Sequence, residues 1–184
     1  MKNTVSMKRS VVALVGAVAL MASMGANGGC GNTGVKNSPD KASKAKTVAH
    51  LGDAITLAGN DHGSKISVAA VRVVDPVRAT DGFSSPDPGN RYVAVRFRFT
   101  NTGSVAYDDA PSNGAKVVDD QGEQFEADFV DKINAGVLLP AQVKAAPGGL
   151  VVGYLVFQVP KKAKVAKVQF SMDSGFGETG EWTL

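Results

Sequence analysis

The sequence predicts an all-β antiparallel sandwich that follows an export leader and a disordered tether. Short segments alternate between apolar and polar residues, turn signals separate them about every 8–15 residues, and no helical pattern is sustained after the leader. All twelve aromatic residues lie at Phe83 or later. We therefore expect one folded domain over residues 47–184, which is long enough to bury a hydrophobic core.

The clearest strand pattern runs through residues 91–99. The apolar side chains at positions 93, 95, 97 and 99 face one way, while Ala94, Arg96 and Arg98 face the other. Such alternation is typical of a sheet with one dry face and one wet face. The other predicted strands, separated by clusters of Gly, Pro, Asn and Asp, are 54–57, 65–74, 115–118, 124–129, 150–159, 165–172 and 181–184.

Residues 1–29 form the predicted leader. A basic start, an apolar run at 11–24 and small residues lead up to Cys30, the only cysteine in the chain. This order is typical of a bacterial lipoprotein signal that is cut before Cys30, whose thiol then carries lipid. Two alternatives stay open: secretion without lipid, because Asn27 stands where an aliphatic residue is usual, and an uncut membrane anchor. The apolar run is shorter than the roughly 20 residues that span a bilayer.

Residues 30–46 form a predicted disordered, basic tether, because they contain too few hydrophobic residues to fold. Residues 1–46 carry seven Lys or Arg and one Asp, whereas the rest of the chain carries 13 basic and 16 acidic residues. A basic tether suits the anionic surface of a membrane. The folded part has no excess of basic residues for binding nucleic acid, so we expect no such partner.

A long loop at residues 75–90, rich in proline and with Phe83 near its middle, is the candidate contact surface. The alternative is a surface excursion with Phe83 packed over the edge of the sandwich. Tyr107 and the acids beside it are a weaker second candidate. We expect Trp182, the only tryptophan, to pack on the sandwich edge rather than to serve as an exposed anchor for a partner.

Candidate catalytic and metal-binding residues are weak. His50 and His62 are isolated and lack the spacing of zinc ligands, so we expect them on the surface. Asp108, Asp119 and Asp120 belong to an acidic cluster but lack the extended alternating spacing of a calcium loop, which favours a solvated hairpin turn over a cation site. No serine lies in a nucleophile elbow and no glycine-rich phosphate loop is present, so the sequence predicts no catalytic residues and no cofactor.

Several segments of the second half form a pattern: GNRYVAV at 89–95, TNTG at 100–103, VDDQG at 118–122, LLP at 138–140, and PGG at 147–149 followed by GYLVFQVP at 153–160. Together they resemble a bacterial family of secreted lipoproteins, which is similar to an immunoglobulin-like secreted antigen of mycobacteria. The resemblance covers roughly residues 52–184 and implies an immunoglobulin-like sandwich. It implies no catalytic residues.

These features favour a lipoprotein on the outer face of the cell membrane, acting as a non-enzymatic binding module. The expected partners are the membrane, through the lipid anchor, and an envelope protein, a peptide or a glycan. Two alternatives stay open: a hydrolase that uses carboxylates of the acidic cluster, and a structural module that binds a divalent cation.

Overall fold

A computed structural model describes residues 47–184, so the predicted leader, Cys30 and the predicted tether lie outside the described residues. Within this part, no helix has the length and apolar character needed to cross a membrane. The strands are β1 (Thr47–His50), β2 (Ala54–Ala58), β3 (Lys65–Val77), β4 (Asn90–Asn101), β5 (Tyr107–Asp109), β6 (Ala115–Asp119), β7 (Gln124–Asp128), β8 (Val143–Ala145), β9 (Leu150–Pro160), β10 (Val165–Ser171) and β11 (Thr179–Thr183). The two short helices are α1 (Pro111–Gly114) and the 3₁₀ helix η1 (Asp173–Gly175).

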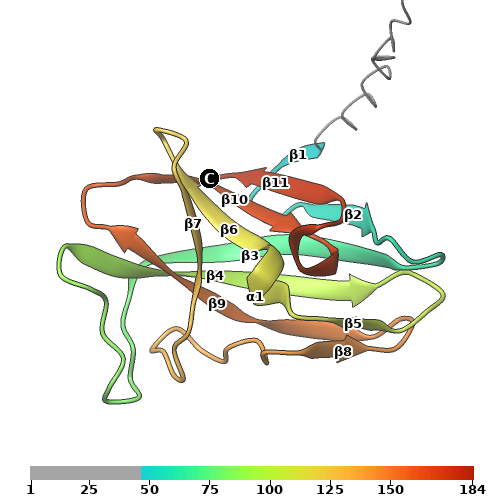
Figure 1. Cartoon of the computed structure of the whole chain (residues 1–184), viewed down its shortest axis with the longest axis horizontal. Coiled ribbons are helices and arrows are strands. Elements are labelled where there is room, and N and C mark those ends of the chain that lie inside the picture. The colour runs from blue at the N-terminus through green and yellow to red at the C-terminus, as the bar shows by residue number, and fades with distance from the viewer. Residues whose placement is uncertain (1–46) are drawn as a thin grey trace, which may run out of the picture. The chain divides into compact units, whose positions relative to one another are not determined.

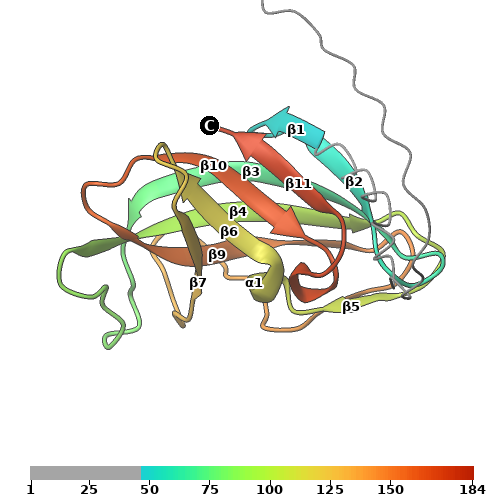
Figure 2. The same cartoon turned by 45° about the horizontal axis from the view of Figure 1, so that its top comes forward.

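Nine strands are hydrogen-bonded in the order β1-β11-β10-β6-β7-β9-β4-β3-β2, and β5 pairs separately with β8. Strand β7 pairs with β6 on one side and with β9 on the other. The chain therefore folds into two facing layers, with β6, β10 and β11 in one and β3, β4 and β9 in the other (Figures 1 and 2). The predicted antiparallel sandwich is confirmed; β1 is the exception, because it lies parallel to β11.

All eight predicted strands are present, with ends that differ by a few residues. Strands β1, β5 and β8 were not predicted, because three or four residues are too short for an alternation to stand out. At β7 the prediction is wrong at its end, since the strand stops at Asp128 and leaves Phe129 outside the ladder.

The main core lies between the two layers and is centred on aromatic rings. Phe97 and Phe99 point inward from β4 and meet Phe170 of β10, with the rings of Phe99 and Phe170 5.1 Å apart. Trp182 is fully buried here, and its indole nitrogen donates a hydrogen bond to the carbonyl of Asp53 at 2.8 Å. Its predicted packing role is confirmed, and the alternative of an exposed anchor is wrong.

The outer face of β4 differs from the prediction. Arg96 and Arg98 are exposed as expected, but Tyr92 and Ala94 are buried. They belong to a second hydrophobic cluster, which also contains Tyr154 of β9 and Ile133. Part of the predicted wet face is therefore dry, because a loop between β7 and β8 covers it.

Candidate binding surface

Two loops meet over this second cluster. Loop A (residues 78–89) joins β3 to β4, and loop B (residues 129–142) joins β7 to β8. We call the two together the loop platform. In Figures 1 and 2 both loops extend from the same end of the sandwich. Hydrogen bonds join them from Thr80 N to Lys132 O (2.8 Å), Asn134 N to Arg78 O (3.0 Å), Arg78 N to Asn134 Oδ1 (3.1 Å) and Asp131 N to Asp81 Oδ2 (3.2 Å).

Asp81 orders the tip of loop A. Its Oδ1 accepts hydrogen bonds from the backbone N–H groups of Phe83 (3.0 Å) and Ser84 (2.8 Å), and its Oδ2 accepts the one from Asp131 of loop B. These hydrogen bonds, led by one from the Ser84 side chain, hold the pKa of Asp81 well below its ordinary value. The carboxylate of Asp81 thus orders the tip of loop A and provides one of the hydrogen bonds that join the two loops.

Loop B sends its hydrophobic side chains in two directions. Val130 and Ile133 are buried in the second cluster and attach the loop to the sheet. Phe129 and Val137 point the other way and are 81% and 79% exposed. Phe83 on loop A is 73% exposed, so three of the four most exposed large hydrophobic side chains in residues 47–184 lie on the loop platform. A gathering of exposed hydrophobic side chains is typical of a contact surface.

Close approach between β9 and loop B keeps the loop in register. A side chain at Gly153 would lie 2.7 Å from the backbone nitrogen of Leu139, so only glycine fits there. Loop B instead forms two backbone hydrogen bonds with β9, from Leu139 N to Tyr154 O at 2.9 Å and from Tyr154 N to Val137 O at 3.0 Å. The backbones of β9 and loop B therefore approach closely at Gly153.

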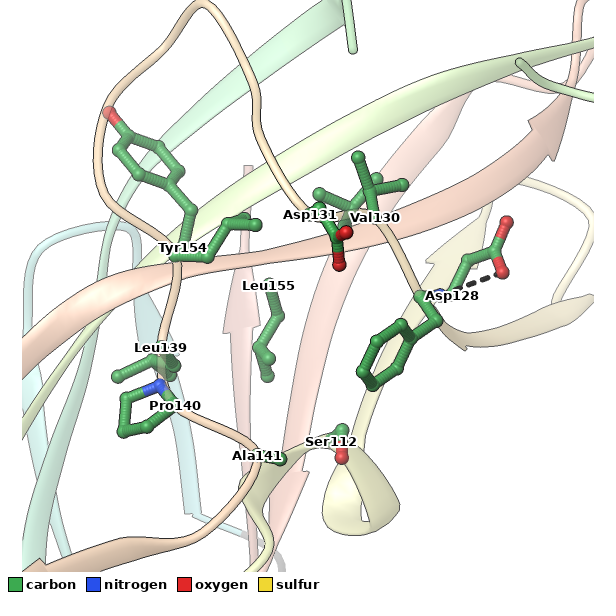
Figure 3. A pocket seen from close by; sticks show the side chains of 12 residues that line it. Ser112, Asp128, Val130, Asp131, Leu139, Pro140, Ala141, Tyr154 and Leu155 are labelled. Atoms are coloured by element: carbon green, nitrogen blue, oxygen red, sulfur yellow. Dashed lines mark hydrogen bonds between the residues drawn. The ribbon is translucent and has the colours of Figure 1, made fainter. Parts of the chain in front are cut away.

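Two hollows of different charge lie at the loop platform. The first, of about 210 Å³, lies between loop B and β9, and its lining residues include Asp128 and Asp131 but no Lys or Arg (Figure 3). The second, of about 650 Å³, lies against loop A and is lined by Arg78, Arg91 and Lys161 together with Asp87, and Arg91 is paired with Asp75 at 2.6 Å. The charged side chains of the first hollow are therefore all acidic, whereas the second hollow has both signs.

Nearby acids also affect the second hydrophobic cluster, as the pKa of Tyr92 indicates. Tyr92 is buried, and burial raises the pKa of its hydroxyl. The negative charges of Asp128, Asp87 and Asp81 raise that pKa further. Loop A and the end of β7 thus contribute negative charge near the hydroxyl of Tyr92.

The two predicted contact residues have different outcomes. Phe83 is on the surface, which excludes the alternative in which it packs over the sandwich edge; its contact role stays a prediction. Tyr107 is a correction, because it is 4% exposed and stacks on Phe99 with ring centres 6.3 Å apart. The pairing of β5 with β8 turns this side chain inward, and burial together with Asp109 raises the pKa of its hydroxyl. Tyr107 therefore offers no surface to a partner.

The acids of the predicted cluster are divided among separate tasks. Asp108 pairs with Lys144 at 2.9 Å, and hydrogen bonding from Gln142, followed by that from Lys144, lowers its pKa. Asp119 is 5% exposed, and its Oδ1 closes the β6–β7 turn by accepting from Gln121 N and Glu123 N. The predicted hairpin turn is thus confirmed.

Asp120 is exposed. Within residues 47–184, its carboxylate accepts a hydrogen bond only from the side chain of its neighbour Gln121. Across residues 47–184, no group of three or more His, Cys, Asp or Glu is arranged to hold a metal ion. His50 and His62 are both exposed, as predicted.

Sequence reasoning missed loop B. Phe129 was assigned to a strand, and Val137 was given no role. One signal could have found the loop: Phe129 and Val130 stand between two acids, Asp128 and Asp131. The strand can end at the first acid, and the aromatic side chain that follows can then turn outward.

The comparisons with known proteins found solved structures to which the chain is similar. Among solved structures, the chain is similar to MPT63, a secreted protein from Mycobacterium tuberculosis, with a TM-score of 0.55, 11% identity, and coverage of 77% of this chain and 100% of the other. It is also similar to the yjhA protein from Bacillus subtilis, with a TM-score of 0.47, 12% identity, and coverage of 67% and 80%. An uncharacterised β-sandwich protein from Clostridium difficile has a TM-score of 0.44, 11% identity, and coverage of 80% and 99%.

No curated protein matches the chain significantly. A family model, described as a domain of unknown function (DUF4352), matches residues 62–181, which span both layers of the sandwich and the loop platform. The expected membership of an uncharacterised immunoglobulin-like domain family is confirmed. The chain belongs to the DUF4352 family.

Proposed function

We propose that this protein is a non-enzymatic binding module held at the outer face of the cell membrane, and that the loop platform is its contact surface. The observation that carries the proposal is the concentration of Phe83, Phe129 and Val137 on two loops that hydrogen bonds hold together. Covering exposed hydrophobic side chains with a partner removes apolar area from water, which is the main driving force of association.

The position of the loop platform supports this role. Its hydrophobic side chains stand on a packed cluster rather than on free chain, because Val130 and Ile133 attach loop B to the sheet. A surface that is already ordered loses little conformational entropy when it binds. The acids of the predicted cluster, Asp108, Asp119 and Asp120, instead form an ion pair or turn hydrogen bonds on separate elements.

Site-specific photocross-linking in intact cells tests the contact surface. A photoreactive phenylalanine analogue replaces Phe83, Phe129 or, as the matched control, Phe176, which is 86% exposed but lies outside the loop platform. We expect the same cross-linked partner from positions 83 and 129 and none from position 176. Equal cross-linking from position 176, or none from any position, contradicts the proposal.

The membrane address has its own test at Cys30. The proposal expects an intact mass from the membrane fraction that corresponds to residues 30–184 with acyl chains at the new amino terminus. Changing Cys30→Ala is expected to move the protein out of that fraction, because several acyl chains together are needed for durable anchoring. An unmodified thiol in the membrane-bound protein contradicts the anchor and leaves the contact surface to be judged by cross-linking.

A further inference from the structure

The hollow between loop B and β9 has a size that suits a single side chain of a ligand. Its volume of about 210 Å³ is below the roughly 300–1,000 Å³ of pockets that enclose whole small molecules. Leu139, Leu155 and Val156 line it, and all three are at least nine-tenths buried, so the apolar wall is rigid. Phe129 also lines it and is 81% exposed, which provides a large apolar surface beside the hollow.

Two carboxylates accompany this apolar wall. In Figure 3, Asp131 lies across from Leu139 and Pro140 with Leu155 between them, whereas the carboxylate of Asp128 points away from Leu155. Asp128 Oδ1 accepts a hydrogen bond from Phe129 N at 2.8 Å. Neither Asp128 nor Asp131 forms an ion pair within residues 47–184, and no Lys or Arg lines the hollow. Their negative charges are therefore uncompensated at close range.

The apolar wall and the unpaired carboxylates together indicate which kind of ligand the hollow can bind. An anionic ligand, such as an acidic lipid headgroup, would be repelled, and a purely apolar one would leave both carboxylates without a counter-charge. A polypeptide that carries a Lys or Arg next to a hydrophobic side chain satisfies both parts of the site. Charge-assisted hydrogen bonds to a carboxylate are about twice as strong as neutral ones.

We propose that this hollow binds an apolar side chain of a partner polypeptide, with a neighbouring Lys or Arg of that partner held by Asp128 and Asp131. The inference rests on the proposed function and adds to it the chemistry of the partner. Loop A would contact the same partner through Phe83, which gives the interaction a second, purely hydrophobic point.

Three eleven-residue peptides test the chemistry on the full-length protein. They are identical except at their centre, which reads Lys-Leu-Lys, Glu-Leu-Glu or Lys-Gly-Lys, and binding is followed by amide chemical shifts in NMR titrations at low salt. We expect Lys-Leu-Lys to bind at least about tenfold more tightly than the other two, with the largest shifts at residues 128–131, 138–141 and 154–156. Raising the salt concentration is expected to weaken that binding.

Paired variants assign the effect to residues. D128N/D131N is expected to lower the affinity for the Lys-Leu-Lys peptide about tenfold, whereas D120N, which removes an exposed carboxylate from the β6–β7 turn, is expected to leave it unchanged. The asparagines keep an acceptor for Phe129 N, so the fold of loop B is preserved. F129S is likewise compared with F176S, which removes an equally exposed ring outside the loop platform.

Three results overturn the inference. They are equal or tighter binding of the Glu-Leu-Glu peptide, shifts from the Lys-Leu-Lys peptide that avoid the hollow, and shifts of the hollow residues with protein concentration alone, which would identify a second copy of the chain as the occupant. If the cross-links of the loop platform form but the peptides fail in this way, the proposed function holds and only the partner chemistry is wrong.

Discussion

The two faces of the sheet formed by β3, β4 and β9 bury hydrophobic side chains by different means. On the inner face, Phe97 and Phe99 pack against a second layer of strands along most of the sheet. On the outer face, Tyr92 and Ala94 are buried only where loop B covers them, and Arg96 and Arg98 beyond the loop stay exposed. The inner cluster holds the domain together, whereas the outer cluster holds a surface in place.

This difference explains why the candidate binding surface lies where it does. Loop B is attached to the sheet by Val130 and Ile133 in the second cluster and by Leu139, which reaches the main core, while Phe129 and Val137 point to solvent. A loop that is packed in this way can present Phe129 and Val137 in a constant position. Changes in the two clusters should therefore have separable effects.

The largest effect is expected from breaking the inner cluster. F170A removes a fully buried ring that contacts both Phe97 and Phe99, and we expect a loss of about 3–5 kcal/mol in the free energy of unfolding. This is a large fraction of the roughly 5–15 kcal/mol that stabilises a typical domain. Urea denaturation followed by the fluorescence of Trp182 measures it. A loss below about 1 kcal/mol would show that the inner cluster is not the main source of stability.

A smaller and more local effect is expected from breaking the outer cluster. I133A removes the side chain that attaches loop B to the sheet, and truncations of this kind cost about 2–5 kcal/mol. We expect a loss of about 2 kcal/mol in the free energy of unfolding, because the loop can detach while the two layers stay packed. Amide hydrogen exchange should accelerate at residues 129–137 and 78–84 but not in β10. Equal acceleration in β10 would mean that the two clusters unfold as one unit.

The smallest effect is expected from removing the charge of Asp81, which should loosen only the tip of loop A. The pKa of Asp81 is lowered from 3.8, so its contribution to loop order is complete above about pH 4 and is lost as the pH falls toward its folded pKa. Protection of the Phe83 and Ser84 amides from exchange should fall over this acidic range. D81N is expected to show reduced protection already at pH 7, with no further change from position 81 on acidification. An unchanged pH profile in D81N would exclude Asp81 as the connecting group.

The sequence predicted those parts of the fold that depend on local alternation. Residues 91–99 form a strand in which apolar residues repeat every second position, and residues 150–159 form one from a nearly continuous apolar run. Tyr107 was placed wrongly on the surface, because a three-residue strand gives no pattern from which its direction can be read. Of the candidate surface, Phe83 was predicted, since a long proline-rich loop is visible in the sequence, while Phe129 was assigned to a strand.

By itself, the sequence determined the β class, the positions of the long strands along the chain and which face of β4 is dry at positions 93, 95, 97 and 99, because side chains alternate between faces at every residue. Only the tertiary structure decided that loop B returns over Tyr92 and Ala94, pairs with loop A and leaves Phe129 beside an acidic hollow. These features depend on contacts between residues that are distant in the sequence, such as Thr80 with Lys132, and no local periodicity encodes such contacts.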